Sequence, residues 1–135
     1  MNVRTIVCSL ICIVIIGCSK NSEFDTALIN ARAAHKSLMV EFGATWCSDC
    51  QNLARELERE PLNSCVRKKL HVFRVDIGEF NRNLDIASRL GIDIKNGVIP
   101  TAVFMPPAAN TRTTKLGTNE ILSFLKQACP ALVTQ

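Results

Sequence analysis

Apolar residues with two different periodicities alternate along the chain, and this alternation restricts the fold more than any other feature. Four segments show helical spacing, and strand-like patterns lie between them. The expected order is α-β-α-β-α-β-β-α, with strands over 37–42, 71–77, 100–105 and 111–117. Strands that alternate with helices and then end in a hairpin favour an α/β domain with a central mixed sheet and helices on both faces.

Individual residues predict some of the boundaries. Pro61 is expected to end or kink the helix that begins near residue 47, because proline cannot donate a helical hydrogen bond. Thr118 is expected to cap the final helix. Asp76, near the end of the second strand, is interpreted as a helix-cap residue rather than a functional one.

Length and composition are those of one folded domain. The chain has 135 residues, and 47% of them are hydrophobic, which is enough for a packed core. The formal net charge is +4 and the sequence has no long basic run, so no nucleic-acid partner is expected.

The first segment is interpreted as an export signal. Its apolar run, Thr5–Ile16, would rise about 18 Å as a helix, which is short of the roughly 30 Å bilayer core. The run ends in Ile-Ile-Gly-Cys, which resembles the lipobox of bacterial lipoproteins. The resemblance implies a diacylglycerol thioether on Cys18. The chain would then divide into a signal peptide over 1–17, a lipidated tether over 18–22 and a domain over 23–135.

The resemblance to a lipobox also implies where the protein is located. Because Ser19 rather than an aspartate follows Cys18, the resemblance implies the periplasmic face of the outer membrane in a Gram-negative organism. Two or three acyl chains anchor a protein firmly, whereas one does not. The exported compartment also permits disulfides between the four remaining cysteines, Cys47, Cys50, Cys65 and Cys129.

Cys47 and Cys50 are separated by only two residues, and this spacing has three interpretations. A structural zinc site needs four ligands, and no second pair with such spacing is present, so no metal is expected. A static disulfide would close almost no loop and would restrain the unfolded chain little. A redox-active pair fits the position best, because the N–H groups and dipole of a helix N-terminus stabilise a thiolate.

Two stretches carry a resemblance to the thioredoxin superfamily. The sequence LMVEFGATWCSDC is an apolar strand with one acid that leads into Trp-Cys-x-x-Cys, and VIPTAVF is similar to the Ile-Pro-Thr loop of thioredoxins. The resemblance covers roughly residues 24–129 and is closest to small bacterial thioredoxin-family proteins with Trp-Cys-x-Asp-Cys. It implies a thioredoxin-like fold and thiol–disulfide oxidoreductase activity.

The resemblance also implies roles for individual residues. Cys47 would be the exposed attacking thiolate, and Cys50 would be the resolving thiol. Glu41 would be the buried acid that exchanges a proton with Cys50, although it is also compatible with an edge-facing strand position. Pro100 would be a cis-proline that presents the Ile99 backbone to a substrate peptide.

Trp46 would flank the site as an apolar contact for substrate, or would simply pack. Three departures from ordinary thioredoxin are visible. No strand precedes the first helix, so the sheet should have four strands. The loop Asp93–Val98 is longer, which implies altered client preference, and Ser48-Asp49 replaces the usual Gly-Pro. The charge of Asp49 opposes a thiolate and should make the pair less oxidising.

A second disulfide is expected between Cys65 and Cys129, with two buried free thiols as the alternative. In a thioredoxin-like fold these residues would fall on one face of the sheet, at the ends of two helices far from the active site.

These features predict a membrane-anchored thiol–disulfide oxidoreductase that reduces the disulfides of client proteins. No bound cofactor is expected, but a membrane electron-transfer partner would have to supply reducing equivalents, because the exported compartment lacks a thiol buffer. The alternative is a non-catalytic thioredoxin-fold lipoprotein that binds or chaperones a cysteine-bearing client.

Overall fold

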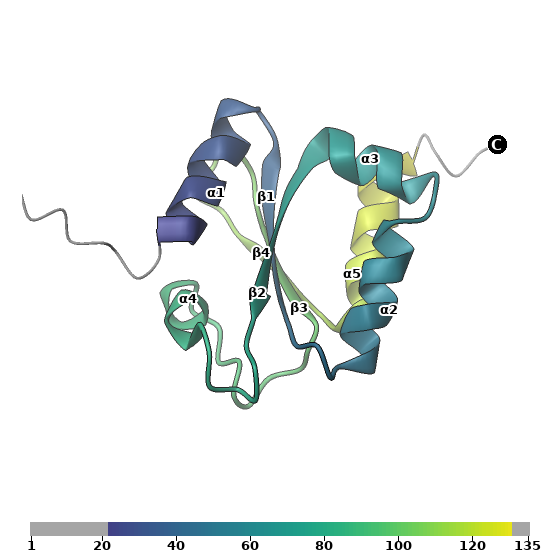
Figure 1. Ribbon diagram of the computed structural model, residues 1–135. Coiled ribbons are helices and arrows are strands. Elements are labelled where there is room, and N and C mark those ends of the chain that lie inside the picture. Colours follow the sequence, from purple (N-terminus) through teal and green to yellow (C-terminus); the bar gives the residue numbers. More distant parts are fainter. Residues whose placement is uncertain (1–21, 131–135) are drawn as a thin grey trace, which may run out of the picture.

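The computed structural model describes residues 22–130, which form one sheet with helices on both faces (Figure 1). The sheet has four strands in the order β2-β1-β3-β4. Its parallel pair is β1 with β2, and β3 runs antiparallel to both β1 and β4. The strands are β1 Ser37–Gly43, β2 Leu70–Asp76, β3 Thr101–Met105 and β4 Thr113–Leu116.

Each face of the sheet has its own hydrophobic core. Helices α1 and α4 cover one face, and α2, α3 and α5 cover the other (Figure 1). The helices are α1 Ser22–Ala33, α2 Ser48–Leu57, α3 Leu62–Lys69, α4 Leu84–Arg89 and α5 Gly117–Ala128. Because side chains alternate along a strand, Leu38 and Val40 of β1 pack under α1, whereas Met39 packs with Leu53 of α2. The expected α/β fold with a four-stranded mixed sheet is confirmed.

Two expected helix caps are wrong. The N-cap residue of α5 is Leu116 and not Thr118, and the helix begins at Gly117 (φ 71°). The Thr118 hydroxyl instead donates a hydrogen bond to the Asp49 carbonyl, 2.9 Å away. Asp76 does not cap a helix either, because α4 begins only at Leu84. The Asp76 carboxylate accepts a hydrogen bond from the Gly78 amide instead. Both side chains serve tertiary or turn contacts that the local sequence does not reveal.

Candidate active site

The cysteine pair lies where β1 leads into α2. Cys47 is the N-cap residue of α2, with an extended backbone (φ −81°, ψ 109°), and its Sγ accepts a hydrogen bond from the Cys50 amide at 3.1 Å. Cys47 and Cys50 form a disulfide with their Cα atoms 5.3 Å apart. The Cys47 sulfur therefore occupies the cap position, where helix N–H groups and the helix dipole stabilise a thiolate once the bond opens.

Both cysteines are buried in this oxidised state. Cys47 is 6% exposed and Cys50 is 7% exposed, so the expected exposed position of Cys47 is wrong for the disulfide form. The Ile99 carbonyl oxygen lies 4.0 Å from the Cys47 Sγ and covers it from one side. A client that reaches Cys47 therefore meets the Ile99 backbone beside the sulfur.

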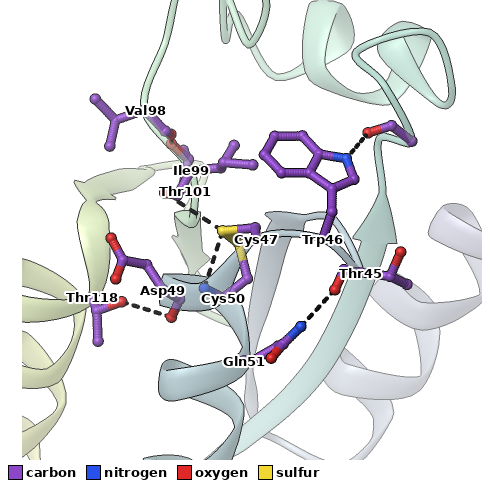
Figure 2. The surroundings of a disulfide bond; sticks show 11 residues. Thr45, Trp46, Cys47, Asp49, Cys50, Gln51, Val98, Ile99, Thr101 and Thr118 are labelled. Carbon is purple, nitrogen blue, oxygen red and sulfur yellow. Dashed lines mark hydrogen bonds between the residues drawn. A yellow bond between two sulfur atoms is a disulfide. The ribbon is translucent and has the colours of Figure 1, made fainter.

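The loop that covers Cys47 is held firmly. The Ile99–Pro100 peptide bond is cis. The Thr101 hydroxyl donates a hydrogen bond to the Val98 carbonyl, and the Pro100 carbonyl accepts one from the Gly117 amide at 2.7 Å. These bonds place the Ile99 backbone next to the disulfide, as Figure 2 shows.

Apolar side chains surround the disulfide. Trp46 lies on one side of Cys47, and Val98 and Ile99 lie on the other (Figure 2). Trp46 and Val98 are each about half exposed, as is Leu116 at the end of β4. Exposed apolar residues of this size around a reactive pair suit contact with a polypeptide.

Glu41 is buried on the face of β1 that α2 covers. It is 3% exposed, and its Oε2 atom lies 3.3 Å from the Arg74 Nε. Burial raises the pKa of the Glu41 carboxyl above its ordinary value of 4.5, and the nearby Arg74 guanidinium offsets this only in part. A carboxyl with a raised pKa keeps its proton to a higher pH than an ordinary carboxyl, which suits a group that exchanges a proton with a thiol.

Gly43 separates Glu41 from Cys50. A Cβ atom at Gly43 would lie 3.2 Å from the Cys50 Sγ and 4.0 Å from the Glu41 Oε1. The lack of a side chain leaves room between the carboxyl and the sulfur. Both groups also line one cavity of about 280 Å³. Its lining residues include Glu41, Gly43, Cys50, Gln51, Arg74 and Asp76.

Most of the expected site residues meet at one end of the sheet: Glu41, Trp46, Cys47, Cys50, Ile99 and Pro100. Cys65 and Cys129 lie elsewhere, in α3 and just after α5, and form a second disulfide with Cα atoms 6.1 Å apart. Cys18 falls outside the described residues.

Two site residues were not anticipated from the sequence, namely Arg74 and Gly43. The β1–β2 register places Arg74 opposite Glu41, and only that register identifies it. A glycine four residues before Cys47 was a visible signal for the close approach of Cys50 to β1.

Residues 22–130 contain neither a metal-ligand cluster nor a helix that could span a membrane. No group of three or more His, Cys, Asp or Glu side chains in this range is placed to hold a metal ion. Over the same residues, no helix combines the length and apolar character needed to cross a bilayer.

Comparisons with known proteins agree with this geometry. Residues 20–107 match the family described as Thioredoxin-like. The chain is 27% identical to Thioredoxin H4 of Arabidopsis thaliana over 94 residues, which cover 67% of this chain and 69% of that protein. It is 28% identical to a Thioredoxin H-type protein of Oryza sativa subsp. indica over 99 residues, covering 71% and 70%.

A solved structure is also similar. The disulphide isomerase from Xylella fastidiosa Temecula1 superposes with a TM-score of 0.69 and 26% identity, over 84% of this chain and 94% of that one. The matched family, these relatives and the Cys47–Cys50 disulfide agree on one chemistry. The chain therefore belongs to the Thioredoxin-like family and is a thiol–disulfide oxidoreductase.

Proposed function

We propose that the protein is a membrane-anchored oxidoreductase of the exported compartment that reduces the disulfides of client proteins. The observation that carries the proposal is the Cys47–Cys50 pair at the start of α2. The pair lies beside the Ile99 backbone and near the exposed apolar side chains of Trp46 and Val98. Trp46, Ile99 and Pro100 are the proposed contacts for the client polypeptide.

The reaction has two exchange steps. The Cys47 thiolate attacks one sulfur of the client disulfide; a mixed disulfide forms and the other client sulfur leaves as a thiolate. Glu41 then accepts the proton of Cys50, whose thiolate attacks the Cys47 sulfur. The second client thiol is released and the Cys47–Cys50 disulfide is restored, so two electrons pass from the pair to the client. A membrane electron-transfer partner then reduces the pair again.

The direction of electron flow is the first test. Asp49 adds a negative charge to the turn that holds the thiolate, which disfavours the thiolate and lowers the oxidising power of the pair. We expect a reduction potential of about −270 mV, near thioredoxin, rather than about −120 mV. Equilibration of the purified protein with glutathione measures it, and turnover of insulin disulfides tests catalysis. A potential near the oxidising value would make the protein a disulfide donor instead.

Glu41→Gln is expected to slow release of the mixed disulfide, most clearly near neutral pH, while attack by Cys47 stays largely unchanged. The same variant should gain stability at neutral pH. Because the folded-state pKa of Glu41 is raised, the wild-type protein loses stability as pH rises from 4.5 through that pKa, and glutamine has no such loss. Resolution kinetics and the free energy of unfolding, each measured at pH 4 and pH 7, check both effects.

The pair of results for Glu41→Gln separates function from packing. A stability gain together with unaltered resolution would remove Glu41 from the reaction and leave it a merely buried acid. Equal stability of both proteins at pH 4 and pH 7 would contradict the raised pKa.

Lipid anchoring rests on the Ile-Ile-Gly-Cys sequence that precedes the domain. Cys18→Ser is expected to release the protein from membranes or to leave its signal uncleaved. Fractionation and intact mass measure this, and Ser19→Ala is the matched control, because it leaves the lipidated residue in place. Unchanged membrane partition and mass in Cys18→Ser would contradict the anchor.

The loop Asp93–Val98 is a proposed determinant of client choice. Its Asp93 carboxylate accepts hydrogen bonds from the Asn96 amide and side chain, and Val98 at its end is exposed next to the disulfide. The loop places no acid, base or nucleophile against the sulfurs, so its influence falls on recognition rather than on exchange.

A further inference from the structure

The segment 77–83, between β2 and α4, is an ordered turn that reaches the active site. We call it the Asp76 turn, after the last residue of β2, which directly precedes it. Gly78, Phe80 and Asn83 all have positive φ angles, of 55°, 58° and 51°. Non-glycine residues rarely adopt this conformation, and they keep it only where surrounding contacts determine it.

The Ile77 carbonyl accepts hydrogen bonds from the Asn81 and Arg82 amides, and Asp76 supplies further contacts. Its Oδ1 atom accepts a hydrogen bond from the Gly78 amide at 3.0 Å, and its Oδ2 atom pairs with the Arg82 guanidinium at 3.2 Å. Its main-chain carbonyl accepts a hydrogen bond from the Asn83 side chain at 2.7 Å. One residue therefore bonds to both the start and the end of the turn.

The Asp76 turn contacts Trp46 through two of its residues. The indole Nε1 of Trp46 donates a hydrogen bond to the Gly78 carbonyl at 3.0 Å (Figure 2). The Phe80 ring packs beside the indole, with ring centroids 5.8 Å apart. Trp46 remains half exposed, so these two contacts, rather than burial, fix the ring beside Cys47.

We infer that Asp76 is a positioning residue: by fixing the Gly78 carbonyl and Phe80 it holds Trp46 as one wall of the site for polypeptide substrates. Val98 and Ile99 form the opposite wall across Cys47 (Figure 2). The inference rests on the proposed reduction of client polypeptides. A small disulfide reaches the sulfurs without using these walls, so Asp76 affects the affinity for polypeptides and not the exchange chemistry.

Asp76 also lines the cavity that contains Glu41 and Cys50, so its charge offers a competing explanation for any loss of activity. Asp76→Asn separates the two. Asparagine keeps a side-chain oxygen for the Gly78 amide but removes the charge and the Arg82 ion pair, which is exposed and contributes little. Positioning predicts that Asp76→Asn behaves like the wild type, whereas an electrostatic role predicts that it behaves like Asp76→Ala.

The measurement uses a natural probe, because the chain has one tryptophan and no tyrosine. Fluorescence anisotropy decay and acrylamide quenching then report on Trp46 alone. In Asp76→Ala we expect a more mobile, more easily quenched indole and a KM for insulin disulfides raised about fivefold, the size expected for one lost hydrogen bond. The rate with oxidised glutathione should stay within about twofold.

Asp85→Ala is the matched control, because this exposed aspartate of the neighbouring α4 lies outside the Asp76 turn. If Asp76→Ala does not fold by circular dichroism, Gly78→Ala carries the same test. A Cβ there would lie 2.6 Å from the Asn81 Oδ1 and would displace the carbonyl that holds the indole.

Unchanged mobility of Trp46 in Asp76→Ala, or equal losses with insulin and glutathione, would overturn the inference. So would a loss in Asp76→Asn as large as in Asp76→Ala. A wild-type protein that does not reduce insulin would instead contradict the proposed function, while the fluorescence of the resting protein would still decide whether Asp76 holds Trp46.

Discussion

Replacing Cys50 with serine is expected to stop the reaction at the mixed disulfide and to lower turnover at least about a thousandfold. In the native pair the two Cα atoms are 5.3 Å apart, so release of the client is an intramolecular step that needs no second collision. Without the Cys50 sulfur, the client stays bound to Cys47 until an external thiol arrives. Non-reducing electrophoresis followed by mass spectrometry measures the trapped complexes and identifies the clients.

Cys47→Ser is the matched control for this trap, because it removes the sulfur that receives the client and leaves Cys50 in place. It should lose turnover and also form no mixed disulfides. Equal trapping by the two single variants would contradict the assigned order, because it would show that either sulfur accepts a client.

Removing the second disulfide, by Cys65→Ala together with Cys129→Ala, is expected to lower the free energy of unfolding by about 4 kcal/mol. The bond joins residues 64 positions apart, and a crosslink over so long a loop removes much of the conformational freedom of the unfolded chain. Turnover of a small disulfide at low temperature should persist, because the bond joins α3 to the end of α5. These parts lie at the other end of the sheet from the start of α2 (Figure 1). Chemical denaturation without reductant measures the loss.

The active-site pair is the internal control for stability. Cys47→Ala with Cys50→Ala makes the same chemical change, but the bond joins residues only three positions apart. Its removal should therefore cost much less. Equal stability losses in the two double variants would show that loop closure is not the source of the stabilisation. No loss in the Cys65/Cys129 variant would show that the bond contributes nothing to the folded state.

Much of the fold follows from patterns within short segments. Alternating periodicity predicted the sheet and its helices, and the alternation along β1 places Glu41 on the face that α2 covers. One failure came where a side chain has a distant partner. Thr118 has the chemistry of a cap, yet its hydroxyl bonds to Asp49, which lies 69 residues away.

The same distinction holds for the site. The cysteine pair and its place at a helix start are local features, and the sequence shows them directly. Arg74 lies 33 residues after Glu41 in the sequence, and only the pairing of β1 with β2 brings the two side chains together. The bond from Trp46 to the Gly78 carbonyl is invisible for the same reason, since it uses a main-chain atom of an unusual turn.

The two disulfides also restrict each other's alternatives in the maturing chain. Four cysteines within residues 22–130 can pair in three ways before the chain folds. Cys47 and Cys50 are three positions apart in the sequence, whereas Cys65 and Cys129 meet only where α3 lies beside the end of α5. A chain that pairs Cys47 with a distant cysteine cannot complete the far end of the sheet. Once Cys65 and Cys129 are joined, Cys50 is the one partner left for Cys47 among the four cysteines of residues 22–130, so the long-range bond protects the exchangeable pair from mispairing.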